Sequence, residues 1–300
     1  MISLVTACMN RESHLRRTLP AWLNLPHVAE FVLVDWSTRE SFDDLLALDP
    51  RIRIVRAVEE PKWILAYAYN LGISHARGDV ILKCDADCMP DDELAALQPA
   101  PGRFYAGNWR TGNAVGKACA NGQCVFTRAQ WEEVNGYSEV IRRYGFDDED
   151  FYERLAQAGH VRTEINHEQL NFLRHSDDER VVNNSQPASD ATVEEFLNRQ
   201  LHYHEAINRL IAGMMPWGPW FTRATYHPVS SDERLTVVRR DVTREIPIAA
   251  PLMQLARSQA VRFMAGRLCK IAPPVLMRMD EAACLTQLAR LAKASATQAA

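Results

Sequence analysis

The segment from Val80 to Pro90 constrains the fold more than any other part of the sequence. An apolar run leads into two aspartates one residue apart, Asp85 and Asp87, and Pro90 then stops the strand. Side chains alternate along a strand, so both carboxylates are expected on the same side of its end. Close like charges repel unless a cation lies between them, so this strand end suits a divalent cation that carries a diphosphate. An acidic first turn of a following helix is the plainer interpretation.

The first hundred residues alternate between strand and helix patterns. Strands are predicted over residues 2–8, 30–35, 52–57 and 80–85, and helices over residues 11–23, with Asn10 as N-cap, and 63–76. This alternation predicts an α/β fold with a mostly parallel sheet. Ligands gather beyond the carboxyl ends of such strands, where Thr6, Asp35 and Asp85 are expected to meet.

A second acidic cluster follows at residues 147–150, which are all Asp or Glu. Acids favour the first turn of a helix, so a solvated helix N-terminus is the plain interpretation. The apolar residues before and after the cluster favour a buried setting instead. Burial raises the pKa of a carboxyl, which suits a general base.

Two ordered motifs carry a resemblance that covers about residues 1 to 180. The run 68–73, the run 76–80 and Asp85-Ala86-Asp87 resemble the donor-binding half of family 2-like glycosyltransferases of the GT-A fold. Residues 135–139 and 144–155 resemble the C-terminal motif of galactosyltransferases, as in β-1,4-galactosyltransferases and chondroitin-type polymerases. Tyr144, Phe146 and Asp147 replace the Trp, second Gly and Glu of that motif, so the resemblance does not fix the acceptor sugar.

The resemblance implies a donor site and a metal. Asp35 would accept a hydrogen bond from uracil, although an Asp before Ser-Thr is also a routine turn former. The other implied donor contacts are Thr6 near the base or ribose, Asn70 in the donor loop, Asp85 on the ribose or donor sugar, and Asp87 on the metal. Tyr69 stands where the family has Arg, so Arg77 or Lys83 would have to contact the diphosphate.

The resemblance also implies the metal ligands and the base. His175, with His167 as competitor, would join Asp87 on Mn²⁺ (or Mg²⁺), and an imidazole ligand favours Mn²⁺. Asp148 would be the catalytic base, Asp147 would orient the acceptor hydroxyl, and Glu149 and Asp150 would support the loop. The acceptor-binding candidates are Asn108, Trp109, Gln123, Tyr144 and Asp147. Trp109 is as well explained by a core position.

These features predict a metal-dependent hexosyl- or N-acetylhexosaminyltransferase. It would move a sugar, with inversion, from a UDP-sugar to a glycan or lipid-linked acceptor in bacterial-type polysaccharide or glycoconjugate synthesis. Retention stays an alternative, because a retaining family shares a similar acidic motif. A nucleotidyltransferase, or a non-catalytic nucleotide-sugar-binding partner, would also use an α/β sheet with acidic residues at its edge. The first strand lacks the Gly-rich loop that a nucleotidyltransferase usually needs.

Composition narrows the setting of the protein. A net charge of −4 over 300 residues gives no electrostatic case for binding nucleic acid. Seven cysteines without framework spacing, and no pattern of a signal peptide, predict reduced thiols in the cytoplasm. A zinc site built from Cys84, Cys88, Cys119 and Cys124 is the weaker interpretation of four of them.

The sequence predicts a catalytic domain over residues 1–184, with a donor half to about 100 and an acceptor half from 101. Residues 185–300 are predicted to form a mainly helical extension, with a helix over 191–214. Residues 246–279 hold five cations and no acid: Arg257, Arg262, Arg267, Lys270 and Arg278. This segment would contact an anionic membrane at its inner face, cap the catalytic domain, or form an oligomer contact.

Overall fold

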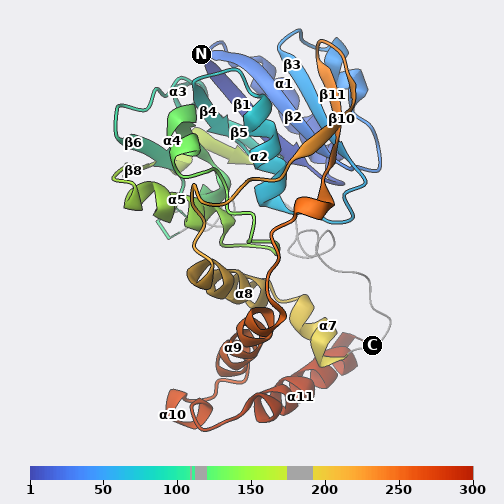
Figure 1. Cartoon of the computed structure of the whole chain (residues 1–300), viewed down its shortest axis with the longest axis vertical. Coiled ribbons are helices and arrows are strands. Elements are labelled where there is room, and N and C mark those ends of the chain that lie inside the picture. Colours follow the sequence, from blue (N-terminus) through green and yellow to red (C-terminus); the bar gives the residue numbers. More distant parts are fainter. Residues whose placement is uncertain (109, 112–119, 174–191, 300) are drawn as a thin grey trace. The chain divides into compact units, whose positions relative to one another are not determined.

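A computed structural model describes residues 1–108, 110–111, 120–173 and 192–299 (Figure 1). The chain forms two compact units. Unit 1 comprises Met1–Glu139, Asp147–His175 and Trp217–Glu245, and unit 2 comprises Val140–Phe146, Ser176–Pro216 and Ile246–Ala300.

Unit 1 is built on a nine-stranded sheet in the order β10-β11-β3-β2-β1-β4-β7-β6-β8. Its strands are β1 (Ile2–Cys8), β2 (Val28–Trp36), β3 (Ile52–Val58), β4 (Val80–Lys83), β6 (Arg103–Ala106), β7 (Cys124–Thr127), β8 (Val161–Glu164), β10 (Tyr226–Ser231) and β11 (Leu235–Arg240). Strands β11, β3, β2, β1 and β4 run parallel, whereas β7 pairs antiparallel with both β4 and β6. The predicted α/β fold with a mostly parallel sheet is confirmed.

Helices cover both faces of this sheet (Figure 1). The helices of unit 1 are α1 (Glu12–Leu23), α2 (Leu65–His75), α3 (Asp92–Ala95), α4 (Arg128–Glu133) and α5 (Asp147–Gln157), with 3-10 turns at Asp43–Ala47, Ala120–Gly122, His167–Gln169 and Val242–Arg244. The apolar residues of α2 and α5 join one core cluster with alternate residues of the strands, and those of α1 join the other. Strands buried on both faces read as continuous apolar runs, which is why β1 and β2 were recognisable in the sequence.

The end of β4 differs from the prediction. The strand ends at Lys83 and not at Asp85, and residues 86 and 87 form a turn before β5 (Cys88–Pro90), which pairs with β9 (Leu170–Phe172). Helix α1 holds this turn, because the Thr18 hydroxyl donates to the Ala86 carbonyl oxygen at 2.8 Å. Strand alternation therefore does not place Asp85 and Asp87 on one side.

Two further predictions need correction. Asn10 is not the N-cap of α1, because Arg11 occupies that position and Asn10 has a φ of 56°. Residues 226–240 are not helical extension: they form the β10–β11 hairpin, and β11 adds to the sheet beside β3. The division at residues 184/185 stays a prediction, but this hairpin belongs to unit 1.

Unit 2 is helical, as predicted for most of residues 185–300. Its helices are α7 (Val193–Asn198), α8 (Leu201–Met214), α9 (Ala250–Leu268), α10 (Pro273–Leu276) and α11 (Glu281–Ala299). Helix α9 packs against α8, α10 and α11. Asn208 on α8 donates to the carbonyl oxygens of Arg143, Tyr144 and Gly145 and so holds that segment within the unit. None of the described helices combines the length and the apolar character needed to cross a bilayer.

We expect Gly72→Ala to destabilise unit 1. A Cβ at Gly72 would lie 2.5 Å from Cγ2 of Val34 and 2.8 Å from Cγ1 of Val5, so α2 would have to move away from the sheet. Overpacking of this kind costs about 1–3 kcal/mol, against a helix-propensity gain of about 1 kcal/mol. Denaturation followed by tryptophan fluorescence reports on unit 1, because all seven Trp residues of the sequence lie in its segments.

Gly213→Ala is the matched control. A Cβ at Gly213 in α8 has no heavy atom within 4 Å, and Gly213 belongs to unit 2, so this change is expected to leave the fluorescence transition of unit 1 unchanged. A Gly72→Ala protein more stable than the wild type would contradict the close approach of α2 to the sheet.

Candidate functional site

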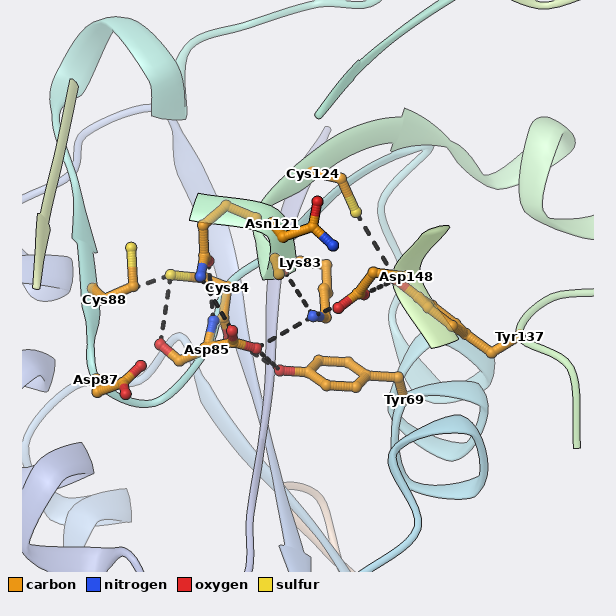
Figure 2. A network of polar contacts seen from close by, with 12 residues as sticks. Tyr69, Lys83, Cys84, Asp85, Asp87, Cys88, Asn121, Cys124, Tyr137 and Asp148 are labelled. Carbon is orange, nitrogen blue, oxygen red and sulfur yellow. Dashed lines mark hydrogen bonds and ion pairs between the residues drawn. The ribbon is translucent and has the colours of Figure 1, made fainter. Parts of the chain in front are cut away.

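A buried lysine lies at the centre of the site (Figure 2). Lys83 is the last residue of β4 and is 0% exposed. Its ammonium donates to the carbonyl oxygen of Gly122 at 2.6 Å and to Oδ1 of both Asp85 and Asp148 at 3.1 Å. One cation thus joins the carboxylates of both acidic motifs of the sequence.

Asp85 is held by neighbours from two elements. The Tyr69 hydroxyl on α2 donates to Asp85 Oδ1 at 3.0 Å, and the Gln123 side-chain amide donates to Asp85 Oδ2 at 3.1 Å. A Cβ at Gly122 would lie 2.1 Å from Asp85 Oδ2, so only glycine fits against this carboxylate. The Asp85 side chain is nevertheless 35% exposed, which leaves it open to a ligand.

Asp148 lies in the first turn of α5 and is buried. Its Oδ1 also accepts a hydrogen bond from the Tyr137 hydroxyl at 3.4 Å. Burial raises the pKa of Asp148 above its usual range, and the positive charge of Lys83 opposes that rise. Burial and the charge of Asp148 raise the pKa of the adjacent Asp147 well above its usual range. The site therefore holds a carboxylate that is ready to accept a proton.

Lys83 stays a cation despite its burial. Burial alone would lower the pKa of its ammonium, but the carboxylates of Asp148 and Asp85 raise that pKa well above its usual range. The Tyr69 ring adds a cation–π contact, with its centroid 4.5 Å from Lys83 Nζ. Neither Lys83 as a link between the two acidic motifs nor the two tyrosines were recognised from the sequence. The sequence did contain one indication of this link, namely a lysine inside an otherwise apolar strand. A buried charge needs a partner of opposite charge, so such a lysine indicates a nearby carboxylate.

Glu149 and Asp150, the rest of the acidic cluster, pair with arginines of unit 1. Asp150 pairs with Arg154 at 2.8 Å, and Arg154 also donates to the carbonyl oxygens of Val134 and Gly136. Glu149 lies 3.4 Å from Arg162. These contacts fix the helix start that carries Asp148.

Of three predicted ligand-binding residues, two are hydrogen-bonded within the protein and the third lies at the other end of β4. The side-chain amide of Asn70 forms hydrogen bonds with Trp131, Tyr137 and Glu139 through all of its donor and acceptor groups. The structure therefore does not favour a direct contact between Asn70 and the sugar nucleotide. Gln123 exchanges two hydrogen bonds with Asp85, at 3.0 and 3.1 Å, and so positions that residue rather than an acceptor. Arg77 precedes β4, at the edge of the sheet opposite to Asp85, and its backbone N–H donates to Glu30.

Asp35 forms a turn, as an Asp before Ser-Thr often does. Its Oδ1 accepts from the backbone and hydroxyl of Thr38, and its Oδ2 accepts from Arg56 at 2.6 Å. Thr6 is fully buried, and its hydroxyl oxygen has no hydrogen-bond partner in the part of the chain that the structure describes. The contacts of Asp35 and Thr6 with a nucleotide stay predictions.

The remaining candidates have other partners or lie outside the described residues. Asn108 donates to Glu164 and accepts from the Arg110 backbone N–H at 3.0 Å. Tyr144 belongs to unit 2, where its carbonyl oxygen accepts from Asn208. Trp109 and His175 lie outside the described residues.

Asp87 is the described half of the predicted metal site. Its side chain is 10% exposed, and the guanidinium of Arg11 lies 3.8 Å away. A carboxylate oxygen with an imidazole nitrogen is a donor set that fits Mn²⁺, and the diphosphate of a donor would supply further oxygens. Within the described ranges, no three His, Cys, Asp or Glu residues form a metal-binding group, and Cys84, Cys88 and Cys124 are free thiols. A zinc site is therefore not supported there.

Comparisons with known proteins agree with the fold. Residues 3–107 match the family model described as glycosyl transferase family 2, and residues 109–176 match the model described as N-terminal domain of galactosyltransferase. No curated protein matches the sequence. Among solved structures, the catalytic domain of Drosophila β-1,4-galactosyltransferase 7 with xylobiose is similar, at a TM-score of 0.50 and 16% identity.

That alignment covers 84% of this chain and 98% of the Drosophila chain. A mutant of the same enzyme with manganese, UDP-Gal and xylobiose aligns at a TM-score of 0.51 and 14% identity, over 84% and 98% of the two chains. The fold is that of a GT-A domain. With the two family matches, the chain is a glycosyltransferase of the GT-A type. A nucleotidyltransferase and a non-catalytic binding partner gain no support.

We expect the stability of unit 1 to fall with rising pH because of Glu139. This residue accepts hydrogen bonds from Asn70 and from the Ala224 backbone, and burial raises its pKa from 4.5 to about 7. The folded state therefore binds the extra proton. Its stabilisation is full below pH 4.5 and is lost as pH rises toward and through about 7.

Urea titrations followed by tryptophan fluorescence measure this effect. Glu139→Gln should flatten the slope of unfolding free energy against pH by up to about 1.4 kcal/mol per pH unit. The exposed Glu132→Gln in α4 is the control and should leave the slope unchanged. An identical slope in Glu139→Gln and the wild type would contradict the raised pKa.

Proposed function

We propose that unit 1 transfers a sugar, with inversion, from a UDP-sugar to a hydroxyl of a glycan or lipid-linked glycan. The observation that carries the proposal is the shared contact of Lys83 with Asp85 and Asp148, 3.1 Å from each. It unites a carboxylate open to a ligand with a buried carboxylate that suits a general base. The UDP-Gal and manganese bound by the Drosophila relative support UDP and Mn²⁺ as the first choices.

The proposed sugar transfer takes place in a single displacement, with Asp148 as the proton acceptor. Asp148 takes the proton of the acceptor hydroxyl, and the freed oxygen forms a bond to the anomeric carbon of the donor. The bond from that carbon to the diphosphate oxygen breaks, and the nucleoside diphosphate leaves with its electron pair. The transition state is oxocarbenium-like, and a single displacement inverts the configuration.

The other residues position the reactants. Asp85 accepts hydrogen bonds from the ribose or donor sugar through its exposed face, and Asp147 orients the acceptor hydroxyl. Asp87 and His175 would hold Mn²⁺, which supplies Lewis-acid stabilisation of the charge on the leaving diphosphate.

We expect slow release of nucleoside diphosphate from one member of a panel of UDP- and GDP-sugars in the presence of Mn²⁺. Release should stop with EDTA and return with added Mn²⁺. Asp87→Ala and Asp148→Asn should each lower the rate by at least about 100-fold, because they remove a metal ligand and the base. The anomeric configuration of the product, measured by NMR, shows whether the transfer inverts or retains the configuration of the donor.

The exposed Asp92→Asn in the first turn of α3 is the matched control and should keep the wild-type rate. If the protein neither binds nor turns over any sugar nucleotide, the proposal is wrong. A retained configuration would overturn the inverting step alone.

We also propose that unit 2 contacts an anionic membrane at its cytoplasmic face, which suits a lipid-linked acceptor. Phe263, Val275 and Met277 are 47%, 55% and 81% exposed. Arg267, Lys270 and Arg278, all exposed, flank these apolar residues along the chain. Apolar side chains among cations match the chemistry of an anionic lipid surface, although the cations do not share one helical face.

Co-sedimentation with vesicles tests this contact. Binding is expected to phosphatidylglycerol vesicles and not to phosphatidylcholine vesicles. It should weaken in Lys270→Glu/Arg278→Glu, since each basic residue near the surface contributes about 1 kcal/mol. No pelleting with anionic vesicles would reject membrane contact. Self-association without vesicles would instead favour an oligomer contact.

A further inference from the structure

Lys83 has a complete set of partners, each from a different part of unit 1. An ammonium offers three N–H donors, and the carbonyl oxygen of Gly122, Asp85 and Asp148 supply three acceptors at 2.6, 3.1 and 3.1 Å. These acceptors belong to the turn before β7, the segment after β4 and the start of α5. Lys83 thus connects the donor-side and acceptor-side motifs through one atom.

The energetics of burial make this lysine unusual. Removing an ammonium from water costs several kcal/mol unless it is paired and hydrogen-bonded. Lys83 is 0% exposed at a position where strand residues around it, such as Ile81 and Leu82, are apolar. A purely structural strand would be served by an apolar residue there, because replacing buried ion pairs by apolar residues is often neutral or stabilising.

We propose that Lys83 is a positioning residue for the transfer: its ammonium keeps Asp148 ionised and oriented toward the acceptor hydroxyl, and ties it to Asp85. This inference rests on the proposed function of Asp148 as the base. Lys83 need not touch donor or acceptor, because it acts through these two carboxylates.

The charges around Asp148 support this role. It is faced by Lys83 on β4, by Asp147 on its own helix, by Asp85 after β4, and by the hydroxyl of Tyr137. Cys124 on β7 and Tyr69 on α2 also face the ammonium, and burial raises the pKa of both groups, so both stay neutral. Lys83 is thus the cation that opposes the burial of Asp148. Without it, Asp148 would stay protonated up to a higher pH, so a smaller fraction of the enzyme would carry the base form at a given pH.

The test compares Lys83→Met, Lys83→Arg and the control Lys62→Met, which removes an exposed lysine of the same chain. Three quantities are measured: kcat and KM for the donor across a pH series, and the affinity for UDP with Mn²⁺ by calorimetry. In Lys83→Met, kcat should fall at least about tenfold, and the acidic limb of the pH profile should move up by roughly one pH unit or more. UDP affinity should change by no more than about threefold, less than one kcal/mol.

Lys83→Arg separates charge from position and covers the case in which Lys83→Met does not fold. Its cation should leave the acidic limb near the wild-type position. Its planar guanidinium should not reproduce the three contacts, so kcat should still fall. A wild-type kcat in Lys83→Arg would overturn the positioning role.

Two further outcomes would overturn the inference. One is a Lys83→Met enzyme with a wild-type pH profile. The second is a parallel loss of kcat and UDP affinity without any shift of the acidic limb, which is the signature of a structural role alone.

A failure of the proposed function can be distinguished from a failure of the inference about Lys83. If the proposed function is wrong, the wild type turns over no sugar nucleotide. The effect of Lys83 on Asp148 is still measurable by carboxyl NMR, with Asp148→Asn used to assign the signal. Lys83→Arg should leave the midpoint of the Asp148 titration near the wild-type value, whereas Lys83→Met should raise it. An unchanged midpoint in Lys83→Met would overturn the inference.

Discussion

The pairing of one buried ammonium with two carboxylates is the interaction on which the site depends. In a low-dielectric interior, Asp85 and Asp148 would repel each other and take up protons unless a cation lay between them. Lys83 supplies that cation from the end of β4, within 3.1 Å of both. Lys83 therefore offsets both the repulsion between the two carboxylates and the burial of Asp148.

A second set of contacts holds the two motifs in place. Asn70 on α2 bonds the backbone of Tyr137, and Arg154 on α5 bonds the carbonyl oxygen of Gly136, so one segment is tied to both helices. Tyr137 then reaches Asp148 with its hydroxyl and stacks on Phe151 at 4.5 Å between ring centroids. The base is thus oriented by neighbours that are themselves fixed, which a preorganised site requires.

The sequence predicted the parallel sheet and both acidic motifs, because these are set by local patterns: apolar runs in β1 to β4 and acids at the start of α5. The sequence did not predict which side chains bind these acidic residues, because Lys83 and Asp148 are 65 residues apart and contact each other only in the folded chain. Asn70 and Gln123 have polar groups that suit a ligand equally well, and the sequence could not show that neighbouring side chains and backbone groups hydrogen-bond them in the folded chain. Strand β10 was missed because its residues are mostly exposed and include Pro228, which weakens a strand pattern.

A crystal structure with UDP and Mn²⁺, with anomalous data collected at the manganese edge, tests the central claim most directly. We expect an anomalous peak beside the Asp87 carboxylate and the diphosphate, with Asp85 on the ribose side and Lys83 still bridging Asp85 and Asp148. Manganese and nucleotide bound elsewhere, or Lys83 separated from both carboxylates, would contradict it.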